Sequence, residues 1–194
     1  RAFRILVVEG TRDGEEMTPF VSLELSQGAG VGQFDAQVET AANIGAVDLV
    51  PFQIVVFNNV ERLNRETLGR LKTWQEAGGR ILVALGDRAD LRHYNEEFLP
   101  ALLPGVRLIE VKGDLQSSNS FFTMTPRVAG HAAFAGFKAT PGEPLSGAQF
   151  WRVVMADAGD RARVLAEFGQ ILPALLEVDG GAIFCSSFDA RWNN

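Results

Sequence analysis

The chain has 194 residues, of which 46% are hydrophobic and 22% are charged, and its formal net charge is −6. This composition is typical of a folded domain with a sizeable core and excludes a largely disordered chain. Lysine and arginine do not cluster, which disfavours a nucleic-acid partner because phosphate neutralisation needs grouped cations. One cysteine, Cys185, and two histidines, His93 and His131, lack metal-motif spacing, so we expect no disulfide, no metal and no cofactor.

Buried strands are the first signal along the chain. The compact apolar runs FRILVVEG (3–10) and FQIVVFNNV (52–60) are typical of strands buried on both faces. Between them, FDAQVETA (34–41) alternates between apolar and polar residues, which also predicts a strand. The segment GEEMTPFVSLELSQG (14–28) combines an acidic start with an apolar stripe, and it predicts a helix between the first two strands.

The clearest predicted helix covers LNRETLGRLKTWQEAGG (63–79). Asn64 is placed to cap its N-terminus, and Gly78-Gly79 ends it. Leu71 and Trp74 recur at helical spacing, so we expect both side chains on the side that faces the core.

The second half of the chain predicts one helix and several strands. The segment DLRHYNEEFLPALLPG (90–105) predicts a helix ended by proline, and VRLIEVKG (106–113) predicts a strand. AQFWRVVMA (148–156) and ARVLAEF (162–168) predict a pair of strands joined by a DAGD turn. PALLEVDGGAIFCSSFD (173–189) predicts a short strand, a Gly-Gly turn and a final buried strand.

Alternation of apolar strands with helices predicts a single α/β domain over residues 1–194. We expect a three-layer sandwich around a mostly parallel, flavodoxin-like sheet, with the hairpins of 148–184 extending one edge in antiparallel fashion. The strands at its centre should be 3–8, 53–57, 80–85 and 182–186.

Polar residues follow four of these strands. Ligands bind at the carboxyl ends of strands in open α/β sheets, so these residues should converge on one rim. The candidates are Glu9, Gly10, Asn58, Asn59, Gly86, Asp87, Arg88, Ser186, Ser187 and Asp189. Their carboxylates could hold a cation or a sugar hydroxyl. The alternative is that loops of this fold are polar anyway and that Asn58, Asp87 and Asp189 cap neighbouring helices.

Three stretches resemble a known family. FQIVVFNNVERLNRETLGRLKTWQEAGGRILVALGDRAD (52–90) resembles the pattern of class I glutamine amidotransferase-like domains in bacterial membrane proteins, of the BatA type or associated with von Willebrand factor A domains. GHAAFAGF (130–137), with Ala132 in place of the usual proline, and GGAIFCSSFDARWNN (180–194) resemble the family's later motifs. The resemblance implies a flavodoxin-like, extracytoplasmic piece of a longer, membrane-anchored protein whose partners are other parts of a membrane-associated assembly.

The catalytic residue of that family is missing. True amidotransferases carry a cysteine on the sharp turn after the strand equivalent to 80–85, where this chain has Gly86 and Arg88. The stretch directly before the last strand has no histidine that could activate a thiol. Cys185 lies inside an apolar run, which indicates a buried thiol. We therefore predict no catalytic residue, as in a pseudoenzyme.

Three functions remain open from the sequence. The first is a non-catalytic binding or protein-interaction module of a bacterial membrane-anchored protein. The second is a hydrolase that acts on a sugar or an amide through rim carboxylates, which a carboxylate separation of about 5 to 9.5 Å beside a deep pocket would favour. The third is a structural spacer. No apolar run reaches the roughly 18 residues of a membrane span, so membrane contact is expected only through parent-chain helices beyond these residues, and a cytoplasmic location stays open.

Overall fold

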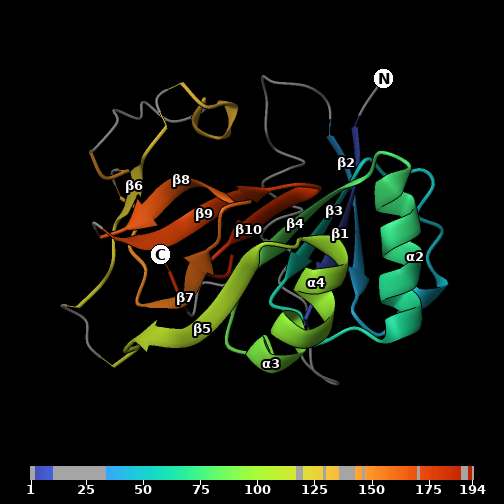
Figure 1. Ribbon diagram of the computed structural model, residues 1–194, viewed down its shortest axis with the longest axis horizontal. Helices are drawn as coiled ribbons and strands as arrows, with labels where there is room; N and C mark the ends of the chain where they lie inside the picture. The colour runs from blue at the N-terminus through green and yellow to red at the C-terminus, as the bar shows by residue number, and fades with distance from the viewer. Residues whose placement is uncertain are drawn as a thin grey trace.

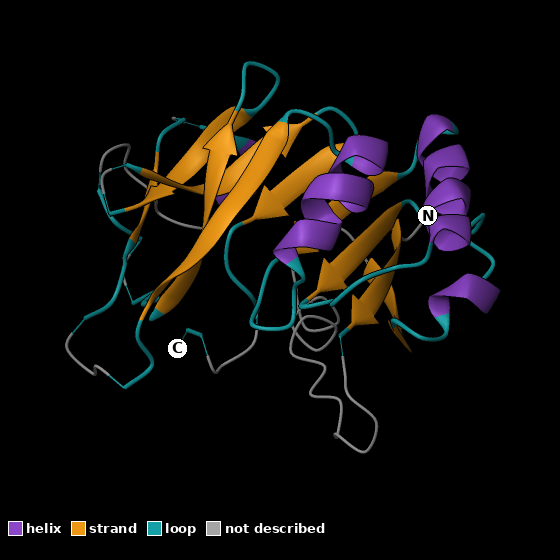
Figure 2. Cartoon of the chain, turned by 60° about the horizontal axis from the view of Figure 1, so that its bottom comes forward, coloured by secondary structure: helices purple, strands orange, loops and turns teal. Residues whose placement is uncertain are grey.

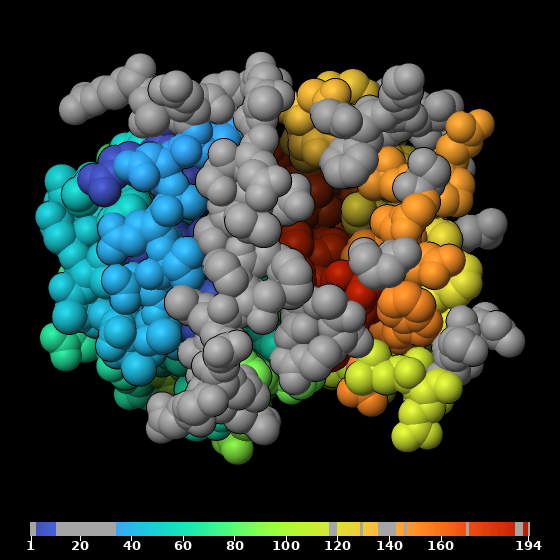
Figure 3. All heavy atoms as spheres, turned by 180° about the vertical axis from the view of Figure 1, so that it is seen from behind, coloured from blue at the N-terminus to red at the C-terminus, as the bar shows by residue number. Residues whose placement is uncertain are grey.

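A mixed sheet of eight strands forms the centre of the protein, in the order β2-β1-β3-β4-β10-β9-β8-β6 (Figure 1). The computed structural model describes residues 3–10, 34–116, 120–128, 130–135, 143–145, 147–169, 171–188 and 192–193. The helix predicted over 14–28 lies outside the described residues. Seen from behind, the N-terminal strands (blue) lie on one side, the C-terminal residues (red) near the middle, and the residues drawn in orange on the other side (Figure 3).

The parallel half of the sheet agrees with the prediction. Its strands are β2 (Phe34–Thr40), β1 (Phe3–Glu9), β3 (Ile54–Asn58), β4 (Arg80–Ala84) and β10 (Gly181–Phe184), and each is parallel to its neighbour in this order. The four strands expected at the centre are therefore adjacent. Their apolar residues do not alternate because both faces are covered, and in β1 Leu6, Val7 and Val8 are all fully buried.

Three antiparallel strands extend the sheet beyond β10. β9 (Leu172–Val178) and β8 (Arg163–Phe168) lie in the segment expected to do so, whereas β6 (Met124–Pro126) lies outside it and was not predicted. The predicted pairing of 148–156 with 162–168 is wrong, because β7 (Arg152–Ala158) pairs with β5 (Val106–Gly113) in a separate two-stranded sheet. A turn signal predicts that the chain reverses, but it does not determine which strand becomes the hydrogen-bonded neighbour.

The described helices gather on one face of the parallel half (Figure 2). They are α2 (Arg65–Glu76), the continuous run of α3 (Leu91–His93), the π-helical η2 (Tyr94–Phe98) and α4 (Leu99–Leu102), and the 3-10 turn η1 (Ile44–Ala46). A further 3-10 turn, η3 (Ala132–Phe134), lies in the second half of the chain. The opposite face of the sheet has its own apolar cluster, with Ile5, Val7 and Val56 buried.

Helix α2 begins and packs almost as the sequence predicts. The Asn64 side-chain oxygen accepts a 2.8 Å hydrogen bond from the Thr67 amide, which satisfies an amide that the helix itself cannot. Leu71 is fully buried, as expected. Trp74 is only half-buried at the edge of the core, and its indole N–H donates to the Phe52 carbonyl at 3.1 Å.

Removing this cap should destabilise the protein measurably. We expect Asn64→Ala to lower the free energy of unfolding by about 1 kcal/mol, because the Thr67 amide loses its acceptor. Asn64→Asp, which keeps an acceptor oxygen, should stay near the wild-type value. Urea denaturation of the three proteins makes the comparison, and equal midpoints for all of them would contradict the capping role.

Candidate functional site

The carboxyl ends of β1 and β3 meet in a closed hydrogen-bonded arrangement. The Asn58 side-chain amide donates to Glu9 Oε2 at 2.8 Å, and the Phe188 amide donates to Asn58 Oδ1 at 3.2 Å. The Gly10 amide donates to the Asn58 carbonyl at 2.9 Å. Glu9 and Asn58 are each only 6% exposed. The predicted convergence is present, but these side chains bond to one another beneath the surface.

Asn59 joins the end of β3 to the turn after β4. Its φ is 52°, and it is the one non-glycine residue in the described part of the chain with a positive φ. Its side-chain amide donates to Asp87 Oδ1 at 2.8 Å, and its Oδ1 accepts from the Arg88 amide at 3.0 Å. Asparagine adopts this left-handed conformation more readily than other residues with a side chain. We call Glu9, Asn58, Asn59, Gly86 and Asp87 the rim network.

Two glycines make room for Asn59. A β-carbon at Gly86 would lie 2.3 Å from Asn59 Oδ1, and one at Gly10 would lie 1.7 Å from the Asn59 carbonyl oxygen. Real β-carbons do not approach other atoms so closely, so the turn after β4 has no space for a side chain while Asn59 keeps its place. A side chain at position 86 would therefore require the Asn59 carboxamide to move.

The remaining candidates lie in different surroundings. Asp87 is exposed and Arg88 is half-buried at the outside of the rim network. Ser186 is fully buried, and its hydroxyl donates to the Arg152 carbonyl of β7 at 3.0 Å. Ser187 is also fully buried, and Asp189 lies outside the described residues.

Helix capping does not explain the rim residues. The side chain that caps α2 is Asn64, and the one that caps α3 is Asp90, which accepts from the Arg92 and His93 amides. The alternative that Asn58 and Asp87 cap these helices is therefore wrong, since both bond within the rim network.

The thiol and the two histidines have structural surroundings. Cys185 is fully buried, and burial raises the pKa of its thiol to about 12. His131 Nδ1 accepts a hydrogen bond from the Ala133 amide at 3.2 Å and so caps η3. His93 Nε2 accepts one from the Leu63 amide at 3.2 Å, and the side chain is half-buried. No three potential metal ligands cluster in the described part of the chain.

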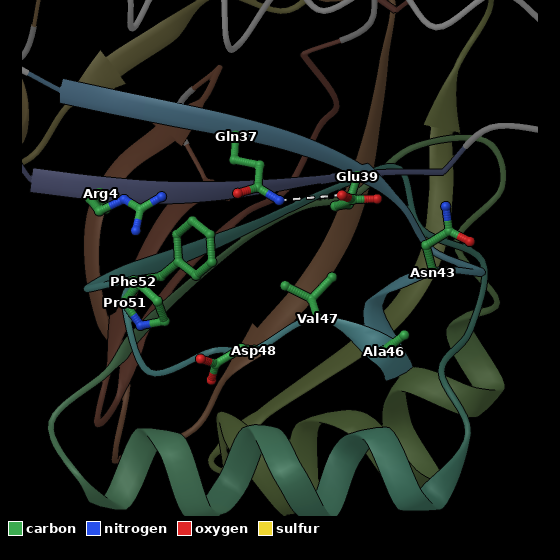
Figure 4. A pocket seen from close by; sticks show the side chains of 9 residues that line it. All are labelled: Arg4, Gln37, Glu39, Asn43, Ala46, Val47, Asp48, Pro51 and Phe52. Atoms are coloured by element: carbon green, nitrogen blue, oxygen red, sulfur yellow. Dashed lines mark hydrogen bonds between the residues drawn. The ribbon is translucent and has the colours of Figure 1, made fainter.

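A cleft of about 470 Å³ opens away from the rim, between β2 and the connection from β2 to β3 (Figure 4). It is lined by Arg4, Gln37, Glu39, Asn43, Ala46, Val47, Asp48, Pro51 and Phe52. The Gln37 amide donates to Glu39 Oε1 at 3.3 Å, and the Arg4 guanidinium carbon lies 5.1 Å from the centre of the Phe52 ring. A polar ligand in this cleft would meet carboxylate and amide groups as well as apolar side chains such as Val47 and Phe52.

The sequence prediction missed this cleft. Its signal was present, because alternation along 34–40 places Gln37 and Glu39 on the same face as the buried Leu6 and Val8 of β1. The connection to β3 contains only the three-residue η1, which is too short to cover that face as a helix would. An adjoining cleft of about 650 Å³ shares Asp48 and Phe52 and continues toward Trp74.

Comparison with known proteins shows the fold alone. No protein-family model and no curated protein matches the chain. It is similar in structure to the cytoplasmic protein STM1381 from Salmonella typhimurium LT2, at 13% identity over 98% of this chain and 90% of that one, with a TM-score of 0.73. It is also similar to the N-terminal domain of IFT52, at 14% identity over 97% of this chain and 89% of that one, with a TM-score of 0.61.

Part of a larger enzyme has the same fold. A β-galactosidase from Rahnella sp. R3 matches at 14% identity over 99% of this chain, with a TM-score of 0.64. The chain spans only 30% of the length of that galactosidase. A shared fold at this identity does not transfer an activity.

The close packing at Gly86 can be tested by adding one methyl group. We expect Gly86→Ala to lower the free energy of unfolding by about 1–3 kcal/mol, because its β-carbon would collide with the Asn59 carboxamide. Gly69 lies within α2 with nothing near its would-be β-carbon, so Gly69→Ala should instead stabilise the protein by about 0.5–1 kcal/mol. If thermal unfolding gave both variants the same shift, the packing described for Gly86 would be incorrect.

The buried thiol leads to a pH dependence. The Cys185 pKa rises from 9.0 to about 12 on folding, so its contribution to stability is fully present below the lower value and is lost as the pH rises toward the upper one. We expect the urea midpoint to fall between about pH 9 and pH 12 more steeply in the wild type than in Cys185→Ala. A thiol-alkylating reagent at neutral pH should label Cys185 only after unfolding. Rapid labelling of the native protein would show that the thiol is accessible.

Proposed function

We propose that this chain is a non-catalytic binding or protein-interaction module. The observation that carries the proposal is the turn after β4, where Gly86 has no room for a side chain and Asn59 fills the adjoining space. The buried Cys185, with its raised pKa, supplies no reactive thiolate in support of acyl chemistry. The polar cleft beside β2 gives such a module a surface on which a ligand could bind.

We further propose the three-layer, flavodoxin-like sandwich and the kinship with class I glutamine amidotransferase-like domains. The strand order β2-β1-β3-β4-β10 and the apolar clusters on both faces of the sheet support the sandwich. The kinship rests on the sequence motifs quoted above.

The proposed location outside the cytoplasm, in a membrane-anchored bacterial protein with partners in a membrane-associated assembly, rests on the same motifs. No helix in the described part of the chain is long and apolar enough to cross a membrane. Fractionation of cells that produce the complete natural protein tests the location. Recovery with the membranes supports it, and recovery in the soluble cytoplasmic fraction contradicts it.

The hydrolase remains the weaker alternative. Two carboxylates, Glu9 and Asp87, lie on the same rim, which favours it. Each of them accepts a hydrogen bond from an asparagine side chain, however, and Glu9 is nearly inaccessible to a substrate. Proton transfer requires direct reach or one bridging water, which the buried Glu9 does not offer. Asp87 is exposed, but glycoside hydrolysis ordinarily uses a pair of reachable carboxylates.

An activity assay distinguishes the two. We expect purified protein to release neither ammonia from glutamine nor nitrophenol from a panel of nitrophenyl glycosides above a buffer control. Turnover that depends on the protein and disappears in Glu9→Gln or Asp87→Asn would replace the interaction module with the hydrolase. These variants keep the size of each side chain, so a loss of turnover would report chemistry, and circular dichroism would confirm that the fold is intact.

A further inference from the structure

The outer half of β5 is an exposed strand edge. β5 pairs with β7 on one side, and no described strand pairs with its other side. From Ile109 onward every residue of β5 is exposed, including the apolar Ile109 at 53% and Val111 at 42%. In Figure 1 the end of β5 extends away from the main sheet. Such an edge is a template for strand pairing.

Hydrogen bonds show which backbone groups of β5 point outward. The Asn95 side chain binds both the amide and the carbonyl of Leu108, each at 2.8 Å, so these groups point away from β7. On the facing strand, the Val154 amide donates to the Cys185 carbonyl at 2.7 Å, away from β5. Val111 lies opposite Val154, and opposed residues in antiparallel strands either bond to each other or both point away. The amide and carbonyl of Val111 therefore point to the open edge.

The two residues beside Val111 carry opposite charges, so two antiparallel copies of β5 can pair each charge with its opposite. Glu110 precedes Val111 and Lys112 follows it, and the two side chains approach to 4.0 Å within the strand. If a second β5 is laid antiparallel with the two-fold axis at Val111, Glu110 of each copy faces Lys112 of the other. Val111 then faces its own copy and exchanges two backbone hydrogen bonds with it. Opposite charges on facing positions stabilise a strand pair.

We infer that the open edge of β5 binds β5 of a second copy of this chain, antiparallel and centred on Val111. This symmetry is the closed, isologous arrangement of most homodimers. A lysine and a β-bulge, which β5 has between Leu108 and Val111, ordinarily protect an edge from unspecific pairing. In this register Lys112 of one copy faces Glu110 of the other. The lysine charge that discourages pairing with unrelated strands therefore favours pairing with a second copy of this chain. The inference goes beyond the proposed function and does not depend on it.

The pairing is short, and the dimer should be weak. Asn95 occupies the edge at Leu108, and Gly113 has a φ of 102°, which ends the extended conformation. Only the segment between these residues can pair. We therefore expect a dimer that dissociates as the protein is diluted from about 1 mM to about 1 µM, a range that spans weak to moderate affinities.

Charge exchange tests the register. Glu110→Lys places lysine opposite lysine at both facing positions, and Lys112→Glu places glutamate opposite glutamate. Each should weaken the dimer on the order of tenfold in sedimentation equilibrium. The double variant Glu110→Lys/Lys112→Glu restores opposite charges and should recover the dimer. Glu76→Lys, the same change at the end of α2, is the matched control and should have no effect.

A second variant tests the backbone bonds. Val111→Pro removes the outward amide at the two-fold axis, which edge strands tolerate, and should abolish the dimer while circular dichroism stays native. A protein that is monomeric at about 1 mM overturns the inference. A dimer that withstands the single charge variants, or that the double variant fails to recover, overturns this register. Glutamine or glycoside turnover would overturn the proposed function alone.

Discussion

The left-handed conformation of Asn59 is the constraint on which the rim depends. A φ of 52° is unfavourable for a residue with a side chain by roughly 1–2 kcal/mol, and the carboxamide offsets this by bonding to Asp87 and to the Arg88 amide. The same conformation brings the Asn59 carbonyl against Gly10 and its side chain against Gly86. The position of Asn59 therefore favours glycine at both position 10 and position 86. At this end of the strands, where open α/β sheets bind ligands, the Asn59 backbone and side chain pack against both glycines.

The sequence predicts those parts of the fold and the rim that depend on local patterns, and it misses those that depend on contacts between residues far apart in the chain. Parallel strands must bring their carboxyl ends together, so the apolar runs predict that Glu9, Asn58 and Gly86 converge. Helix α2 follows from local spacing and the Asn64 cap. Whether the converged side chains face solvent or each other depends on one backbone angle at Asn59, which no periodicity reports. The partner of β7 depends likewise on a strand forty residues earlier in the chain, where local turn signals do not reach.

Proteins of different kinds share this fold. A galactosidase and the N-terminal domain of IFT52 have the same architecture at 14% identity to this chain, so the sheet itself carries no particular chemistry. Catalysis at this end of the sheet would need an accessible nucleophile or carboxylate. Here Cys185 and Glu9 are buried, and Asp87, the exposed carboxylate of the rim network, accepts a hydrogen bond from the Asn59 side chain.

Uncovered surfaces also lie at the edges of the two sheets. At β2, the short connection to β3 leaves Gln37 and Glu39 uncovered, and Arg70 of α2 holds the opposite wall by donating to the Ile44 and Val47 carbonyls at 3.4 and 2.6 Å. The cleft is therefore walled by fixed backbone, which reduces the ordering cost of binding. At β5, the outward backbone groups of Val111 lie between opposite charges. Among the described residues, the surface at β2 exists because the short connection to β3 leaves one face of the strand uncovered, and the surface at β5 exists because no strand pairs with its outer edge.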